Sequence, residues 1–534
     1  MNRIMGWSLL SLVVLLGPTG VRVASAQTVN AASCNASDVQ AALNKVAADG
    51  TVVNIPAGTC TWTTAVTYNQ VYSTIIQGQT TVTGNAVPGV PTGPYTVNDQ
   101  TVITDDFAHG SATISITTAT GKSFRMTGLT IVSGTSAAAF NGIVAVFGTS
   151  QSVRIDHNHF NAPRDGDHVV QFNTWTYGVV DHNEFDNGGN VFFLEFYSGG
   201  WYGLPDPNNY GQASWAVSEN FGTNQFTYVE NNYFAGGFAQ DCNYGGRYVL
   251  RYNLVGYGSK LEIHGPSGSF PFRGCRAYEL YGNTFDYVAS PTASNAFAFV
   301  VQMESGTGLW WRNSITGYYQ FLHADVVRTN NSTYAEPATP SGWGYCSATP
   351  VAGVLGPSPW DGNLPGQNGR PCLDGVGRGK GDLLTGAAFP NIVDSVTSTI
   401  TWPNQASVPL YAWMNVFNPV PDSSSQYFAA DAVTVENSDY YLELPNYNEN
   451  TSFNGTAGMG FGLLSARPST CTPHVAWWET DNNQLDYCYA ANTWSTVTST
   501  PASYVPYTYP HPLVTGSQTS GAPSAPTNLG ATVN

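Results

Sequence analysis

Lys260, Glu262 and His264 alternate with Leu261 and Ile263 in one short segment of the chain. Side chains alternate between the two faces of a β-strand, so the aliphatic pair is expected to point inward and the three titratable residues to share the outer face. A lysine or a histidine on such a face can remove a proton, and histidine needs the smaller pKa adjustment. We rank Lys260 first and His264 second as candidate general bases.

Arginines gather around this segment. Arg273 and Arg276 follow it and Arg247 and Arg251 precede it, in a chain that has only 18 lysines and arginines. Guanidinium groups bind carboxylates in a bidentate manner, and neutralising a sugar carboxylate acidifies the neighbouring C5 proton. The group predicts β-elimination on a uronate-containing glycan, with Arg273 and Arg276 as carboxylate clamps. In the alternative interpretation, Glu262 pairs with Lys260 and the arginines only brace a loop.

A second set of candidates recurs two positions before a repeated asparagine. If the repeats stack in register, these outward side chains form one column, which runs from three carboxylates through a guanidinium to two aromatic rings. The carboxylates could bind Ca2+, the guanidinium an acidic sugar, and the aromatic rings further sugar units. The predicted metal ligands are Asp156, Asp181 and Glu230, and the predicted substrate-binding residues are Arg251, Tyr281 and Trp311. Alternatively, the aspartates belong to a common coil pattern without a metal.

The asparagine repeat indicates the element that would position these residues. Successive asparagines lie 25, 49, 21, 30 and 30 residues apart; they are Asn158, Asn183, Asn232, Asn253, Asn283 and Asn313. Short β segments at this spacing are typical of a solenoid of stacked coils. Asparagine tolerates a left-handed backbone at a corner and can hydrogen-bond to its counterpart in the next coil. We therefore predict an all-β solenoid with a structural asparagine ladder.

The solenoid is expected to span residues 27–330. An amphipathic helix with Ser37 as N-cap, Gln40 in a capping box and Gly50 after its end is expected to cover the first coil. The repeat is lost beyond residue 330. Residues 331–513 are expected to form a loop-rich extension packed on the solenoid or a small cap domain, and residues 514–534 a flexible tail.

The helix-then-strand start and the repeats of asparagine followed by an aromatic residue resemble the pectate-lyase-like superfamily over roughly residues 30–330. The resemblance implies a right-handed parallel β-helix. In the lyases of that superfamily, acidic side chains of neighbouring coils hold calcium and a nearby arginine or lysine removes the proton. The aspartate pairs and the Gly-His-Gly signature of polygalacturonase-like hydrolases are absent from this sequence.

Residues 1–26 have the pattern of an export signal, with Arg3, an apolar stretch at 9–16 and small residues before Gln27. Eight cysteines fit an oxidising compartment. Their order suggests four neighbouring disulfides: Cys34 with Cys60, Cys242 with Cys275, Cys346 with Cys372, and Cys471 with Cys488. The net charge of −17 argues against nucleic acid or an anionic membrane as partner. We expect a secreted protein whose partner is a polysaccharide; its oligomeric state stays open.

Three functions remain open at this point. The first is a polysaccharide lyase that acts on acidic glycans. The second is a non-catalytic adhesin or glycan-binding protein, which pairing of Lys260 and Arg273 with carboxylates would favour. The third is a glycoside hydrolase, which needs two carboxylates across a groove; its candidates are Glu195, Glu262, Glu279 and Glu304.

Overall fold

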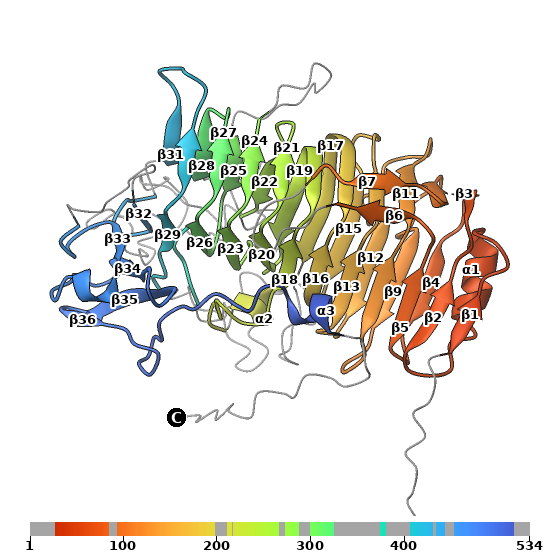
Figure 1. Ribbon diagram of the computed structural model, residues 1–534, viewed down its shortest axis with the longest axis horizontal. Coiled ribbons are helices and arrows are strands. Elements are labelled where there is room, and N and C mark those ends of the chain that lie inside the picture. Colours follow the sequence, from red (N-terminus) through yellow and green to blue (C-terminus); the bar gives the residue numbers. More distant parts are fainter. Residues whose placement is uncertain are drawn as a thin grey trace, which may run out of the picture.

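Stacked parallel β-strands are the main element of the described part of the chain (Figure 1). The computed structural model describes residues 27–84, 93–197, 211–215, 217–265, 273–287, 299–324, 374–380, 406–430, 434–443 and 453–516. The predicted export signal, the Cys346–Cys372 pair and the tail from residue 517 lie outside the described residues. The predicted all-β class and the stacking of successive repeats are confirmed.

Ladder 1 is a parallel sheet of twelve strands among the described residues. In spatial order these are β1 (Thr28–Asn30), β2 (Thr51–Asn54), β5 (Thr74–Gln77), β10 (Phe124–Thr127), β13 (Val153–Asp156), β16 (Gly178–Asp181), β18 (Thr227–Glu230), β20 (Arg247–Arg251), β23 (Ala277–Tyr281), β26 (Thr307–Trp311), β29 (Leu410–Trp413) and β32 (Tyr440–Leu442). The predicted register holds, because Asp156 pairs with Asp181 and Asp181 with Glu230.

Two further parallel ladders complete each coil. Ladder 2 contains β3 (Gly58–Trp62), β8 (Thr101–Asp105), β11 (Thr130–Ser133), β14 (His159–Asn161), β17 (Glu184–Tyr197), β19 (Tyr233–Asn243), β21 (Leu254–Gly256), β24 (Thr284–Asp286), β27 (Ser314–Thr316) and β30 (Val416–Asn418). Ladder 3 contains β4 (Val66–Asn69), β9 (Ile114–Thr118), β12 (Val144–Gly148), β15 (His168–Asn173), the second halves of β17 and β19, β22 (Lys260–Ile263), β25 (Phe299–Met303), β28 (Gln320–Ala324) and β31 (Gln426–Ala430). One coil therefore passes through the three ladders in turn, as β13, β14 and β15 do.

The repeated asparagines form the predicted ladder at the turn after each ladder 1 strand. Asn158 donates from Nδ2 to Oδ1 of Asn183 at 3.1 Å, and Asn183 donates in the same way to Asn232 at 2.9 Å. The series continues through Asn253 and Asn283, and all of these side chains are buried. Each buried amide thus satisfies backbone and side-chain groups of the adjacent coil, which fixes the register of the stack.

Apolar side chains from the three ladders fill the interior. Phe160, Phe185 and Phe234 stack on successive coils with ring centroids 4.8 and 4.7 Å apart, and all three are fully buried. This stacking explains the aromatic residue two positions after each of the corresponding asparagines. The interior is a packed core, so functional groups must lie on the outer faces of the ladders.

The N-terminal helix α1 (Ala36–Leu43) packs on β4 and β1 at one end of the stack (Figure 1). Its buried residues include Val39, Ala42 and Leu43, as the periodicity predicted. The predicted caps are wrong. The N-cap is Asn35, which makes no side-chain capping bond, and the C-cap is Asn44. The capping box does not form, because the Gln40 side chain instead bonds the backbone nitrogen and carbonyl of Thr67 in the first coil.

The ladders extend past residue 330, where we expected them to end. β29 and β32 continue ladder 1, β30 continues ladder 2 and β31 continues ladder 3. The next member of the asparagine ladder is Asn415, which accepts a hydrogen bond from Asn313. It lies 102 residues further along the sequence, so the regular spacing does not reveal it. A long sequence insertion hides a repeat without ending the stack.

The described part of the chain ends in a small sheet and a segment that returns along ladder 1 (Figure 1). The sheet contains β33 (Met459–Gly462), β34 (Ala476–Glu479), β35 (Gln484–Ala490) and β36 (Thr493–Trp494), with the 3-10 helix η1 (Leu464–Ala466) between its first strands. The returning segment ends in α3 (Pro512–Thr515), which contacts β16. The remaining elements are the hairpin β6 (Thr81–Thr83) and β7 (Thr96–Asn98), and the short helix α2 (Gln212–Trp215).

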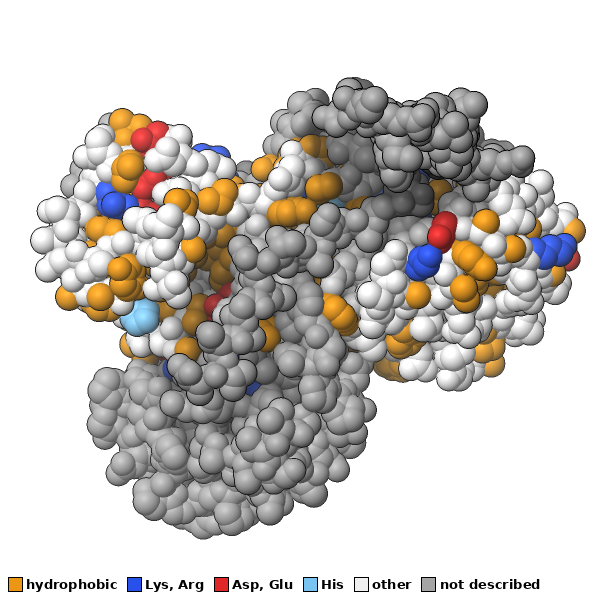
Figure 2. Space-filling view, turned by 90° about the horizontal axis from the view of Figure 1, so that it is seen from below, with side chains coloured by type: hydrophobic (Ala, Val, Ile, Leu, Met, Phe, Trp, Pro, Cys, Tyr) orange, Lys and Arg blue, Asp and Glu red, His pale blue; other side chains and the backbone are white. Residues whose placement is uncertain are grey.

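Three of the predicted disulfides are confirmed: Cys34–Cys60, Cys242–Cys275 and Cys471–Cys488. They fit an oxidising compartment. Within the described part of the chain, no helix is long and apolar enough to cross a membrane. Charged side chains are sparse on the face drawn in Figure 2, in keeping with their 10% share of the sequence.

Candidate functional site

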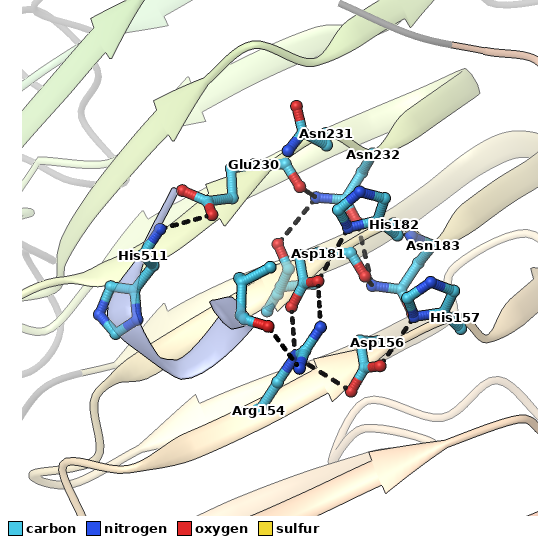
Figure 3. A network of polar contacts seen from close by, with 12 residues as sticks. Arg154, Asp156, His157, Asp181, His182, Asn183, Glu230, Asn231, Asn232 and His511 are labelled. Atoms are coloured by element: carbon cyan, nitrogen blue, oxygen red, sulfur yellow. Dashed lines mark hydrogen bonds and ion pairs between the residues drawn. The ribbon is translucent and has the colours of Figure 1, made fainter. Parts of the chain in front are cut away.

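The column predicted on ladder 1 exists, but the returning C-terminal segment covers it. Arg251 donates to the backbone carbonyls of Tyr507 and Thr508, and Glu230 accepts from the backbone nitrogen of His511 at 2.9 Å. Figure 3 shows His511 beside Glu230, next to the carboxylates of the preceding coils. The column is an internal interface in this structure and not an open groove.

The three predicted metal ligands are each paired with an arginine. Asp156 accepts two bonds from Arg125 (2.6 and 2.7 Å), and Asp181 accepts two from Arg154 (2.8 and 2.9 Å). Burial alone would raise the pKa of Asp156, but Arg125, His157 and Arg154 hold it well below its usual range. Glu230 pairs with Arg251 at 2.6 Å.

These residues do not fit a calcium site. Oxygens of Asp156 and Asp181 and a ring nitrogen of His157 do lie within 4.8 Å of one another, close enough to share an ion. Calcium, however, needs six to eight oxygen ligands, and the carboxylate oxygens of this group already accept from buried or half-buried guanidinium groups. An ion would have to displace Arg125 and Arg154, so we derive no step through a metal.

The predicted substrate-binding residues are also part of the interface. Tyr281 stacks on Trp311 with centroids 4.4 Å apart, and Trp311 packs on Trp413 and on Trp478 of β34. Arg251, Tyr281 and Trp311 are all buried. The alternation of side chains along the strand correctly predicted that these side chains point outward. It carries no information about which distant segment covers them.

Arg273 and Arg276 do not act as clamps, which corrects the prediction. Both are fully buried with their guanidinium carbons 4.9 Å from the ring of Trp215. Arg273 makes a bidentate pair with Asp374, and Arg276 pairs with Glu219 at 2.6 Å. They brace α2 against the coils, as the alternative interpretation held.

Lys260, Glu262 and His264 do share the outer face of β22. Lys260 Nζ lies 3.4 Å from Glu262 and 3.1 Å from Gln302 Oε1, and His264 Nε2 lies 2.9 Å from the other oxygen of Glu262. The second ring nitrogen of His264 lies 3.0 Å from Asp241 on the preceding coil. His264 is thus held between two carboxylates.

The outer face of ladder 3 continues this arrangement across six coils. Residues in register on neighbouring strands form a line that we call the polar row; its members are Gln171, Glu195, Asp241, Glu262, Gln302 and His323. Glu195 is fully buried and accepts from Gln171 and Tyr197, with the His168 ring 2.5 Å away. His264 and Glu262 are the more accessible centre, with 24% and 13% of their side-chain surfaces exposed.

The partners of the polar row shift its proton equilibria. Burial opposes the charged form of His264, but Asp241 and Glu262 raise its pKa well above the usual value. Burial likewise opposes ionisation of Glu262, yet His264 and Lys260 lower its pKa to about 2. Burial raises the pKa of Glu195 despite the adjacent His168. At neutral pH the centre therefore holds a carboxylate acceptor beside an imidazolium donor.

Asp241 was missed as a site residue because β19 departs from simple alternation. Ala239 and Cys242 both belong to the core although they are three residues apart, and the pairing with β22 shifts register between Phe238 and Gln240. A bulge of this kind re-aims side chains and is common beside active sites. Its only sequence signal is the recurrence of acidic residues within the aromatic runs that precede the next repeat.

The remaining hydrolase candidates have other partners. Glu279 accepts from the backbone of Gly222 and from the hydroxyl of Tyr504, and burial raises its pKa to about 7. Glu304 accepts from the backbone nitrogen of Gly265. Of the four carboxylates, Glu195 and Glu262 therefore lie on the polar row.

Comparisons with protein-family models, curated proteins and solved structures found no match to this chain.

Proposed function

We propose that this chain is a secreted, carbohydrate-active, right-handed parallel β-helix of the pectate-lyase-like kind, and that it cleaves a polysaccharide on the outer face of ladder 3. The stacked parallel strands and the buried asparagine ladder support the fold assignment. The three disulfides support export. Shifted pKa values at the partly exposed pair of Glu262 and His264 support an enzyme, because such shifts concentrate at functional sites.

The observation that carries the proposal is the position of His264 between Asp241 and Glu262. Ionised Glu262 is a proton acceptor, which can activate a water molecule at the anomeric carbon. Cationic His264 is a proton donor, which can protonate the glycosidic oxygen as it leaves once the substrate separates Nε2 from Glu262. Asp241 does not need to touch the substrate, because it positions His264 and stabilises its charged form.

The charge balance favours hydrolysis over β-elimination. Elimination needs a positive group to neutralise the sugar carboxylate, but Lys260 is already paired with Glu262. The arginines Arg273 and Arg276 are buried in the brace around Trp215. Elimination on a uronate therefore remains the second chemistry of the same acid–base pair, and hydrolysis of a glycan is the first.

A non-catalytic glycan-binding function is the second candidate. It is favoured by one observation, the pairing of Lys260 with Glu262 and of Arg273 with Asp374. In that case the buried charges of the polar row would stabilise the face and orient hydroxyl groups without proton transfer.

The test is incubation of the purified chain with a panel of neutral and acidic polysaccharides, following reducing ends and absorbance near 235 nm together. Hydrolysis raises only the reducing ends, and elimination raises both. Glu262→Gln should lower the rate by at least about a hundredfold, whereas Glu436→Gln, at an exposed glutamate away from the polar row, should not. Binding without release of reducing ends on any glycan would reject the enzyme in favour of the binding protein.

The pH profile gives a second readout. The pKa of Glu262 is about 2 and that of His264 is raised, so the rate should stay level from mildly acidic to neutral pH and fall at alkaline pH as His264 loses its proton. Asp241→Asn should move this alkaline limb to lower pH, because it removes one of the two carboxylates that stabilise the imidazolium. An unmoved limb would reject the positioning role of Asp241.

A further inference from the structure

Phe140 is the most exposed of the large hydrophobic side chains in the described part of the chain, with 68% of its surface accessible. It lies just before β12, and its position beside the polar row is fixed. Its backbone carbonyl accepts from Gln171 Nε2 at 2.9 Å, and its ring lies 5.4 Å from that of His168. An exposed phenylalanine is thus held at the N-terminal end of the face that carries Glu195 and His264.

Aromatic rings continue from Phe140 along the same ladder. His168 lies 4.9 Å from Phe192, and Phe192 stacks on Phe238 with centroids 4.2 Å apart. These rings come from β15, β17 and β19, which are successive strands of ladder 3. Neighbouring strands are about 4.8 Å apart, so the rings form a strip of regular spacing beside the carboxylates.

Phe192 and Phe238 stack on each other and Phe238 is buried, so the exposed ring of Phe140 is the member of the strip that can contact the apolar face of a sugar ring. The face of an aromatic ring carries partial negative charge and attracts the C–H groups of a pyranose. Ligand sites combine apolar and aromatic linings with a few polar groups that fix orientation, and Gln171 and His168 supply such groups next to Phe140. A single exposed phenylalanine needs no explanation by itself, but here it extends a strip that leads to the acid–base centre.

The two cations that contact the strip, His168 and Lys260, are both paired with carboxylates. His168 is paired with Glu195, and burial opposes its charge although Glu195 raises its pKa. A uronate carboxylate at this position would meet the negative ring face of Phe140 and the carboxylates of the polar row. We therefore propose that Phe140 forms a stacking subsite for an uncharged sugar unit of the glycan that the polar row cleaves, an inference that rests on the proposed function.

The test is affinity electrophoresis of the full chain in native gels that contain galactomannan, xyloglucan, mixed-linkage β-glucan, pullulan or polygalacturonate. The wild type should be retarded by at least one neutral polysaccharide. Phe140→Ala should weaken that binding about tenfold, the equivalent of one stacking contact, and Phe140→Tyr should restore it. Tyr489→Ala, which removes a 43% exposed ring on the C-terminal sheet, is the matched control and should bind as the wild type does.

Phe140 is exposed, so its replacement should leave the melting temperature within about 1 °C of the wild type. Equal binding by Phe140→Ala and the wild type would overturn the subsite, as would retardation by polygalacturonate alone or by none of the five polymers. The two proposals fail separately. Binding that depends on Phe140 without release of reducing ends rejects only the enzyme, and cleavage that is unaffected by Phe140→Ala rejects only the subsite.

Discussion

Replacing Arg251 with methionine should destabilise the protein by about 3–5 kcal/mol, the cost of removing one partner of a buried ion pair. Arg251 is fully buried and donates to four acceptors: Glu230 at 2.7 Å, and the Tyr281 hydroxyl and the carbonyls of Tyr507 and Thr508 at 2.9 Å each. Among the described residues, the substitution leaves the backbone nitrogen of His511 as the remaining hydrogen-bond donor to the Glu230 carboxylate. Methionine fills much of the volume, so most of the loss is electrostatic.

The assay is urea unfolding at pH 7, followed by tryptophan fluorescence, because Trp311 and Trp413 of ladder 1 pack against Trp478 of the C-terminal sheet. Limited proteolysis should show earlier cleavage in the returning segment. Glu230→Gln in the Arg251→Met background is the matched control, and it should recover about 1–3 kcal/mol because no unpaired charge remains.

A loss below about 1 kcal/mol with unchanged proteolysis would refute this reasoning. That result would mean that the ladder 1 column faces solvent, as a substrate-binding column must. Arg251 would then again be a candidate to bind an acidic sugar, and the C-terminal segment would not be a fixed part of the stack.

Three further outcomes are expected. Asn232→Ala should lower the free energy of unfolding in urea by on the order of 3 kcal/mol, since the Asn232 amide donates to the Val180 carbonyl and to Asn253 and accepts from Asn183. A decrease of less than about 1 kcal/mol would contradict a stabilising role of the asparagine ladder. Burial and Arg251 lower the pKa of His511 to about 3, so the unfolded chain binds its proton more readily, and stability should fall as the pH drops from about 6.5 towards 3. His511→Asn, which can still cap α3, should flatten that part of the curve relative to the wild type, and parallel curves would exclude His511 as its source. Replacing Cys242 and Cys275 together by alanine should lower stability by about 2–4 kcal/mol, measured against the wild type in calorimetry, and an unchanged melting temperature would show that the bridge is dispensable.

The sequence alone was sufficient for the features that depend on local periodicity. Alternation placed Lys260, Glu262 and His264 on one outer face, and the spacing of the asparagines gave both the stack and the register of Asp156 with Asp181. Order along the chain gave three disulfides. These features follow from the fixed geometry of a strand and of coils that contact only their neighbours.

Tertiary structure alone decided which outer face is covered. The C-terminal segment contacts Arg251 across more than 250 residues of sequence, and Asp374 reaches Arg273 across 101. No local pattern predicts such partners, so charges that looked available for a substrate are committed to structure. The bulge in β19 that turns Asp241 towards His264 is equally invisible to alternation. Burial and pairing depend on contacts distant in sequence, and these determined that ladder 3, not ladder 1, carries the candidate site.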